Sequence, residues 1–91
     1  MNYKIRYTDK SEKHIKKFEK SGNKIILNKI DRLIEELKIH PRTGTGKPEQ
    51  LKGLPDRWSR RITKKHRLVY KIEDDVVIVL VLSAYGHYNE E

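Results

Sequence analysis

Three residues in the second half of the chain carry groups that together could cleave a phosphodiester bond: Glu49, Arg67 and His87. Cleaving RNA without a metal requires a base that takes the 2′-hydroxyl proton, a cation that balances the charge of the phosphorane, and an acid that protonates the leaving 5′-oxygen. An ionised glutamate can act as the base, a guanidinium binds phosphate oxygens in a bidentate way, and histidine titrates near neutrality. We therefore take the glutamate as the candidate base, the arginine as the candidate phosphate clamp and the histidine as the candidate acid.

Each of these three residues also has a simpler interpretation. Glu49 directly follows Pro48 and could pair with a neighbouring lysine as an ordinary loop carboxylate. Arg67 could belong to a solvated strand face, and a histidine near the end of a chain is often incidental. Three other histidines compete for the acid role, and the one beside the candidate clamp is the closest rival: His14, His40 and His66. On the residues alone, catalytic and structural interpretations both stay open.

The basic charge of the chain is concentrated in one third of its length. The formal net charge is +8, and residues 42–71 hold ten basic and two acidic side chains, whereas the rest of the chain holds eleven of each. Such a field attracts polyanions such as nucleic acid, although a solvated basic face or an acidic protein partner would also explain it. Because neighbouring strand residues point to opposite faces, at least one of Arg60 and Arg61 should share a face with Arg67. The side chains expected to contact RNA are Lys47, Lys52, Arg60, Arg61, His66 and Tyr88.

The composition excludes several classes of site. With no cysteine, neither a disulfide framework nor a thiolate zinc site can form, and the chain shows no metal-ligand spacing and no phosphate-binding glycine loop. No metal and no cofactor are therefore expected. The N-terminus lacks a signal-peptide pattern, and the longest apolar run, residues 76–82, is too short to span a bilayer. We expect a single domain, residues 1–91, in a reducing cytoplasm and without membrane association.

The first half of the chain predicts one strand and two helices. Residues 2–8 alternate between apolar and charged side chains, as a half-buried strand does. A short helix follows, capped by Thr8 or Asp9 and ended near Gly22. From Asn23 onward, apolar residues recur at three- and four-residue steps, which predicts a core-facing helix that stops before the next proline. Its apolar positions are Ile26, Ile30, Leu33, Ile34 and Leu37.

The second half of the chain predicts a loop followed by an antiparallel meander. Residues 41–48 hold two prolines, two glycines and two threonines, which is typical of an irregular connector. Strands are expected at residues 57–63, 66–72 and 76–85, the first two joined by a tight turn at residues 64–65. Because the last strand is almost wholly apolar, it should be central, buried on both faces and near the first strand. The expected fold class is α+β, with two N-terminal helices packed on one face of a small, mainly antiparallel sheet.

Four ordered blocks of the sequence resemble the YoeB/Txe-type toxins of the RelE superfamily. These blocks are residues 44–52 (GTGKPEQLK), residues 58–63 (WSRRIT), residues 66–70 (HRLVY) and the pair His87-Tyr88. The resemblance is dense over about half of the chain, and in the helical half it rests on length and pattern. It implies a RelE-like fold and a toxin of a bacterial type II toxin-antitoxin pair.

The resemblance also implies an activity, namely an endoribonuclease that enters the ribosomal A site and cleaves mRNA there, which stops translation. In that family, the general base, the phosphate-stabilising arginine and the general acid match Glu49, Arg67 and His87. Arg61 would line the site, and Tyr88 would follow the acid. The products would be a 2′,3′-cyclic phosphate and a 5′-hydroxyl. The implied partners are a cognate antitoxin, the ribosome with its RNA, and mRNA, and the resemblance is compatible with a homodimer.

Two other functions compete with this one. A basic α+β domain could bind ribosomal or structured RNA without cutting it, and it would then tolerate Glu49→Ala, since removing an acidic group should not weaken phosphate binding. A toxin of the same superfamily could instead inhibit a protein target such as gyrase. Relatives of that kind generally lack this acid-base set, which favours the ribonuclease.

Overall fold

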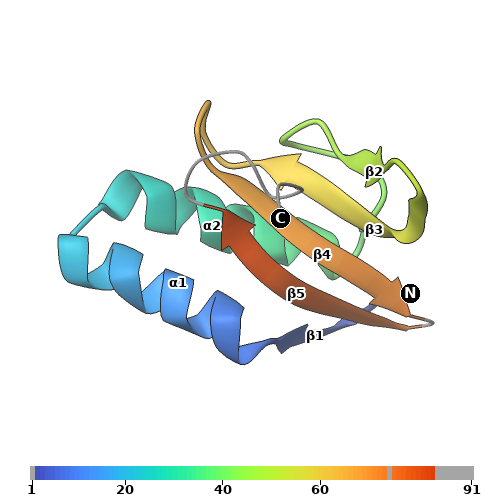
Figure 1. Cartoon of the computed structure of the whole chain (residues 1–91), viewed down its shortest axis with the longest axis horizontal. Coiled ribbons are helices and arrows are strands. Elements are labelled where there is room, and N and C mark those ends of the chain that lie inside the picture. The colour runs from blue at the N-terminus through green and yellow to red at the C-terminus, as the bar shows by residue number, and fades with distance from the viewer. Residues whose placement is uncertain (1, 74, 84–91) are drawn as a thin grey trace.

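The fold is a five-stranded mixed sheet with two helices inserted between its first strand and the other four. The computed structural model describes residues 2–73 and 75–83. In chain order the elements are β1 (Lys4–Tyr7), α1 (Asp9–Ser21), α2 (Lys24–Leu37), β2 (Glu49–Leu51), β3 (Leu54–Arg61), β4 (Arg67–Glu73) and β5 (Val76–Ser83). The strand order is β1-β5-β4-β3-β2, with β1 parallel to β5 and the other pairs antiparallel (Figure 1). The expected α+β class, with two N-terminal helices and a mainly antiparallel sheet, is confirmed.

Side-chain caps fix where the two helices begin and end. The Thr8 hydroxyl accepts a hydrogen bond from the N–H of Ser11 at 3.1 Å, which satisfies one of the free donors at the start of α1. Gly22 ends this helix with a left-handed backbone, φ 70°, which costs glycine nothing. The Asn23 side chain then caps α2 by accepting from the N–H of Ile26 at 3.2 Å. The predicted ends of both helices are thus confirmed to within a residue or two.

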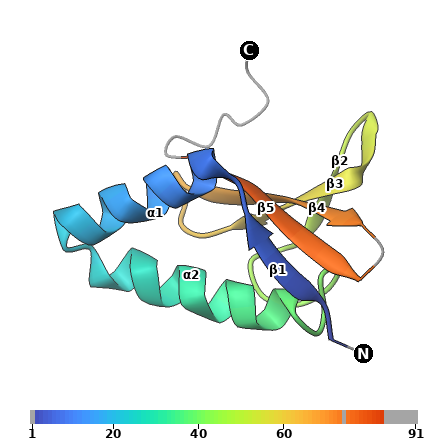
Figure 2. The ribbon, with the colours of Figure 1, turned by 90° about the horizontal axis from the view of Figure 1, so that it is seen from below.

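One row of aliphatic side chains on α2 forms the centre of the core. The buried residues of this helix are the five predicted from spacing: Ile26, Ile30, Leu33, Ile34 and Leu37. They pack in one cluster with Leu68, Tyr70 and Ile72 of β4 and with Val77 of β5. Figure 2 shows α2 running beneath the sheet with α1 alongside it. Burying this row supplies the main apolar contribution to folding, since each large aliphatic side chain contributes about 1.5–3 kcal/mol.

The sheet differs from the prediction in its strands and in their order. The structure adds β2, which begins at Glu49 and pairs with β3, so this residue lies at the start of a strand instead of in a loop. The middle position belongs to β4, and β5 is an interior strand between β1 and β4. A three-residue strand that follows a proline is too short to show alternation, which is why β2 was not predicted from the sequence. The predicted residues 84–85 of the last strand lie outside the described residues.

The turn between β3 and β4 is wider than predicted. The two-residue turn at residues 64–65 is wrong, because β3 ends at Arg61 and residues 62–66 form the connection. The Thr63 hydroxyl oxygen accepts from the N–H groups of Lys65 at 3.2 Å and His66 at 3.1 Å, which closes the turn from inside. Ile62, the first residue of this connection, is buried and belongs to the core.

Candidate active site and nucleic-acid interface

The candidate base and two arginines share the face of the sheet that points away from α2. Glu49 pairs with Ser59, and Arg61 pairs with Arg67, across adjacent strands. Directly paired residues lie on the same face, and so do residues two apart in one strand, which places all four side chains together. Glu49 and Arg61 are exposed, and Arg67 is half-buried. The prediction that one member of the arginine pair shares a face with Arg67 is confirmed, and that member is Arg61.

The spacing on this face suits a phosphodiester group placed between the candidate base, Glu49, and the candidate clamp, Arg67. Glu49 lies two strands away from β4 and two residues along from Arg67. With strands about 4.8 Å apart and a rise of about 3.4 Å per residue, their Cα atoms are about 12 Å apart. Because side chains in strands stand roughly perpendicular to the sheet, the two charged ends stay well apart and leave room for a phosphate between them. The distance between Glu49 and Arg67 could not be predicted from the sequence, because the pairing of β2 with β3 was not predicted.

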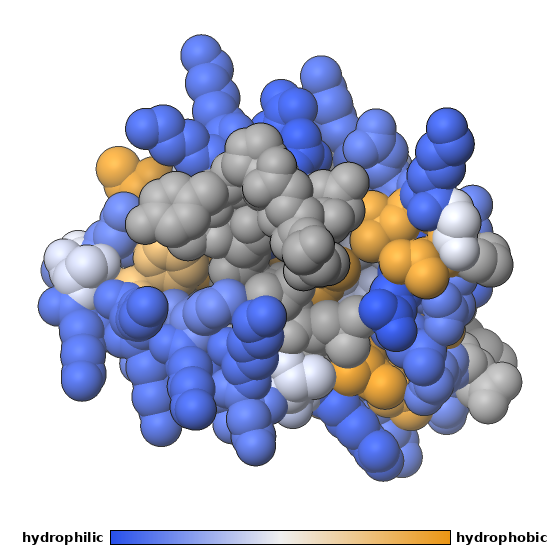
Figure 3. All heavy atoms as spheres, viewed as in Figure 1, coloured by the Kyte–Doolittle hydropathy of each residue, from blue (hydrophilic) through white to orange (hydrophobic). Residues whose placement is uncertain are grey.

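Two lysines flank the strand that carries Glu49. Lys47 lies two residues before it and adopts a left-handed backbone, φ 49°, and Lys52 follows β2 at the turn into β3. Both side chains are exposed, as the predicted RNA contacts require. Figure 3 shows hydrophilic side chains projecting around the rim of the same face. The two lysines add positive charge at the β2 edge of this face, which attracts phosphate.

Arg60 does not belong to this interface, and its predicted RNA contact is wrong. Its side chain is 0% exposed and points to the helix side of the sheet. The reason is strand alternation, since Arg60 and Arg61 are neighbours on β3 and must point to opposite faces. A buried guanidinium needs partners for its donors, and this one finds them within the protein.

Arg60 holds the loop between α2 and β2 in place. One terminal nitrogen, Nη1, donates to the Glu36 carboxylate at 2.8 Å and to the Thr45 carbonyl at 3.3 Å. The other, Nη2, donates to the Thr43 carbonyl at 2.6 Å and to the His40 carbonyl. Arg60, Glu36 and the loop of residues 40–46 together are called the loop clamp below. A charged fork with this many partners stabilises one loop conformation strongly.

Tyr70 completes the loop clamp from β4. Its hydroxyl donates to the Pro41 carbonyl at 2.6 Å and accepts from Nε of Arg60 at 3.2 Å. Burial raises the pKa of the Tyr70 hydroxyl, while the hydrogen bond from Arg60 acts in the opposite direction. The hydroxyl therefore stays protonated at neutral pH and keeps donating to the loop.

The Glu36 carboxylate is charged and is held by two donors. It accepts from the backbone N–H of Thr45 at 2.8 Å and from Arg60 at the same distance. Burial raises the pKa of this carboxyl, but the hydrogen bonds from Thr45 and Arg60 together outweigh it, so that the pKa lies below its ordinary value of 4.5. Glu36 thus contributes an anion to the loop clamp throughout the neutral range.

His66 lies with the helices and not with Glu49. Its ring meets Phe18 of α1 edge to face, with ring centroids 5.3 Å apart, and its Nδ1 lies 2.8 Å from the Thr63 hydroxyl. Burial, followed by the nearby Lys65, lowers the pKa of its imidazole. The structure therefore separates His66 from the face that carries Arg67, which disfavours it as an acid at that face and as an RNA contact there. His87 and Tyr88 lie outside the described residues.

Two polar side chains that the sequence did not single out lie on the same face as Glu49. Nε of Arg57 and the hydroxyl of Ser59 are buried and find no hydrogen-bond partner among the described residues. Both alternate in step with Arg61 along β3, and Ser59 stands directly opposite Glu49. The signal that could have found them is their position four and two residues before Arg61 on one strand, which places all three side chains on the same face.

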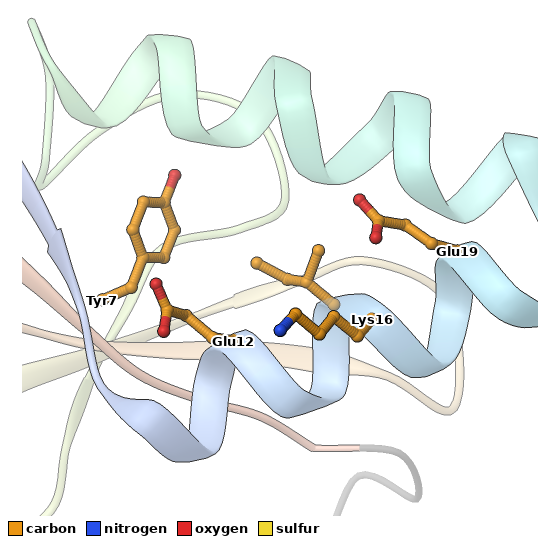
Figure 4. A pocket seen from close by; sticks show the side chains of 5 residues that line it. Tyr7, Glu12, Lys16 and Glu19 are labelled. Carbon is orange, nitrogen blue, oxygen red and sulfur yellow. The ribbon is translucent and has the colours of Figure 1, made fainter.

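The described residues offer no other catalytic centre. They contain no group of three His, Asp or Glu side chains placed to hold a metal ion, and none of their helices is long and apolar enough to cross a membrane. A cavity of about 260 Å³ opens beside α1 at the β1 edge of the sheet, opposite the β2 edge (Figure 4). It is lined by Tyr7, Glu12, Ile15, Lys16 and Glu19. With two carboxylates in its lining, this cavity is unsuited to a phosphate group.

Removing the Tyr70 hydroxyl tests the loop clamp. Tyr70→Phe should lower the free energy of unfolding by about 1–3 kcal/mol, because it leaves both Nε of Arg60 and the Pro41 carbonyl without a partner. Tyr3→Phe is the matched control, since the Tyr3 hydroxyl only accepts an exposed contact of 3.4 Å from Arg42 and should cost less than about 0.5 kcal/mol. Urea denaturation of both variants measures the difference. Equal stability of the two would contradict the role of Tyr70.

The pH dependence of stability tests the charge on Glu36. Because its pKa is lowered in the folded protein, its contribution is present above the ordinary value of 4.5 and is lost as the pH falls through the lower folded value. The difference in unfolding free energy between the parent and Glu36→Gln should therefore be constant near pH 7 and shrink below pH 4.5. Denaturation curves at a series of pH values measure it. A difference that stays constant down to pH 3 would show that the charge contributes nothing.

Comparisons with known proteins agree with this architecture. A family model described as YoeB-like toxin of bacterial type II toxin-antitoxin system matches residues 7–88. Toxin YoeB of Escherichia coli K12 is 48% identical over 58 residues, which are 63% of this chain and 69% of that protein. A solved YoeB/ParE toxin from Agrobacterium tumefaciens has a TM-score of 0.82 at 33% identity, covering 90% of this chain and 98% of its own.

Two solved structures from Staphylococcus aureus are similar as well. A YoeB dimer has a TM-score of 0.80 at 31% identity and covers 97% of this chain and 100% of its own. A YoeB-YefM complex has a TM-score of 0.77 at 30% identity and covers 91% of this chain and 97% of its own. With the family model matching most of its length, the chain belongs to the YoeB-like toxins of bacterial type II toxin-antitoxin systems.

Proposed function

We propose that this toxin is a ribosome-dependent endoribonuclease that cleaves mRNA in the A site and so inhibits translation. The observation that carries the proposal is the placement of Glu49, Arg61 and Arg67 on one face of the sheet. A carboxylate among arginines is unfavourable for simple phosphate binding, because it repels the ligand, but a base is required there for cleavage. The family membership supports the same conclusion.

The chemistry follows from the charges on this face. Glu49 takes the proton of a 2′-hydroxyl, the freed 2′-oxygen attacks the adjacent phosphorus, and the bond from phosphorus to the 5′-oxygen breaks. Arg67 and Arg61 balance the charge that develops on the phosphoryl oxygens. His87, assigned from the sequence, gives its proton to the leaving 5′-oxygen, with Tyr88 beside it. The products are a 2′,3′-cyclic phosphate and a 5′-hydroxyl, and no metal or cofactor enters any step.

The ribosome orders the RNA strand, which this face of the toxin does not enclose. The arginines and Glu49 lie on a sheet surface with no deep enclosure among the described residues, so the protein alone holds a flexible RNA strand poorly. An mRNA that is already ordered in the ribosomal A site needs no further ordering by the toxin. The exposed lysines beside β2 provide the positive charge for docking on ribosomal RNA, which accumulates phosphate at high density.

Relatives indicate the partners of this toxin. The Staphylococcus aureus relative forms a complex with YefM, and it has also been solved as a dimer. We extend both to this chain as proposals, namely a cognate antitoxin that neutralises the toxin and a homodimer in the free state. Action on translating ribosomes places the protein in the cytoplasm.

Removing the proposed base should abolish cleavage while leaving binding intact. Glu49→Gln keeps the shape of the side chain and removes its charge, and we expect cleavage on translating ribosomes to fall by about 10²–10⁴-fold. Asp56→Asn is the matched control, because Asp56 is the other carboxylate of the basic third and should be replaceable without loss. Both variants should bind ribosomes at least as tightly as the parent, since each gains net positive charge.

The outcome separates this function from a binding module. A Glu49→Gln variant that cleaves at the parental rate would rule out the proposed base. A parent protein that binds ribosomes and produces no cleaved mRNA would establish a non-catalytic RNA-binding function instead.

Ribosome dependence can be measured separately. Primer extension on one mRNA should show new 5′ ends when the protein is added to a translating mixture, and about a hundredfold fewer when ribosomes are left out, because positioning then costs the reaction its orientation. Arg67→Ala should lose the ends in both mixtures. Equal cleavage with and without ribosomes would overturn the ribosomal setting.

A further inference from the structure

We infer that Glu36 and Arg60 are positioning residues that hold Glu49 in place for the reaction. The inference rests on the proposed function of Glu49 and extends it to two residues on the helix side of the sheet. Neither side chain can touch RNA bound to the face that carries Glu49, since Arg60 is fully buried and Glu36 bonds to the loop and to Arg60 on the other side of the sheet. They act through the backbone of the loop clamp.

The backbone of residues 40–46 is hydrogen-bonded mainly by side chains from outside this loop. It lies between the end of α2 and the start of β2 and contains neither helix nor strand. The carbonyls of His40, Thr43 and Thr45 are instead met by Arg60, and the N–H of Thr45 is met by Glu36. The loop conformation therefore depends on Glu36 of α2 and Arg60 of β3, together with the Tyr70 hydroxyl of β4.

The loop clamp is connected rigidly to Glu49. The Gly46 carbonyl accepts from the N–H of Arg61 at 2.7 Å, which fixes the end of the loop to β3. No side chain fits at Gly46, because a Cβ there would come within 2.8 Å of the Arg61 carbonyl oxygen, and its φ is 84°. Lys47 then turns the chain with a left-handed φ of 49°, and Pro48 fixes its own φ. Glu49 is the next residue, so few free dihedrals separate the base from the clamp.

Gly44 brings the loop into direct contact with Glu36. A Cβ at Gly44 would lie 2.3 Å from Oε1 of Glu36 and 3.3 Å from Nη1 of Arg60. The backbone at Gly44 therefore packs directly against the ion pair between Glu36 and Arg60. Truncating the Glu36 side chain removes the group against which the loop packs and so allows the loop to shift, and a shift of about 1 Å at a reacting group can cost about a hundredfold in rate.

Glu36 is the better residue to change, because Arg60 is fully buried and its loss could unfold the protein. The Glu36 side chain is 26% exposed and its hydrogen bonds all lie in the loop clamp. Glu36→Ala removes the acceptor of the Thr45 N–H, whereas Glu36→Gln keeps an oxygen there and removes the charge. Glu35→Gln is the matched control on the same helix, since Glu35 pairs only with the exposed Lys38 among the described residues.

The experiment combines hydrogen exchange with single-turnover cleavage on translating ribosomes for the parent and these three variants. In Glu36→Ala, the amides of residues 45–51 should exchange about tenfold faster, and the maximal cleavage rate at saturating toxin should fall by about 10- to 100-fold. The toxin concentration that gives half the maximal rate should stay within about twofold, because the basic side chains are untouched. Glu36→Gln should recover most of the rate, and Glu35→Gln should match the parent.

The exchange data distinguish a failure of this inference from a failure of the proposed function. Unchanged exchange at residues 45–51 in Glu36→Ala would overturn the inference whatever the cleavage assay shows. Faster exchange with a parental maximal rate would also overturn it, because the clamp would then be structural only. Absence of cleavage by the parent and by Glu35→Gln would instead refute the proposed function, together with any positioning role in it.

Discussion

One buried guanidinium determines where the candidate site lies. A charge removed from water is tolerated only when its donors are satisfied, and Arg60 satisfies them with the Glu36 carboxylate, the Tyr70 hydroxyl and three backbone carbonyls of one loop. The loop must therefore fold over the end of β3. Because Glu49 follows this loop directly, the partners that Arg60 requires on one side of the sheet set the position of the carboxylate on the other.

Strand alternation separates the residues that stabilise the fold from the residues of the candidate site. Along β3, Arg60 points to the core and the next residue, Arg61, points to solvent beside Arg67. Two identical side chains thus have opposite roles because of a single-residue difference in register. The same rule places Ser59 with its unpaired hydroxyl opposite Glu49. A toxin of about ninety residues can in this way build a rigid site without a deep cavity.

The sequence predicted those features that repeat along the chain or follow from one side chain. The spacing of apolar residues identified the buried row of α2, Gly22 marked the end of α1, and alternation required Arg61 or its neighbour to join Arg67. The sequence did not show which of the two arginines is buried. The partners of Arg60 are mainly backbone carbonyls of an irregular loop, and every residue type has a backbone carbonyl. The short β2 was missed for a related reason, since its existence depends on pairing with β3.

If Glu49 activates a 2′-hydroxyl of ribosome-bound mRNA, removing that hydroxyl from the mRNA should prevent cleavage. We would measure single-turnover cleavage of two mRNAs on stalled ribosomes, one with ribose and the other with 2′-deoxyribose throughout the A-site codon. Cleavage of the first into a fragment with a 2′,3′-cyclic phosphate and one with a 5′-hydroxyl, and no cleavage of the second at that codon, is the predicted result. Cleavage of both mRNAs at the A-site codon would contradict the mechanism, because the nucleophile could not then be the 2′-oxygen.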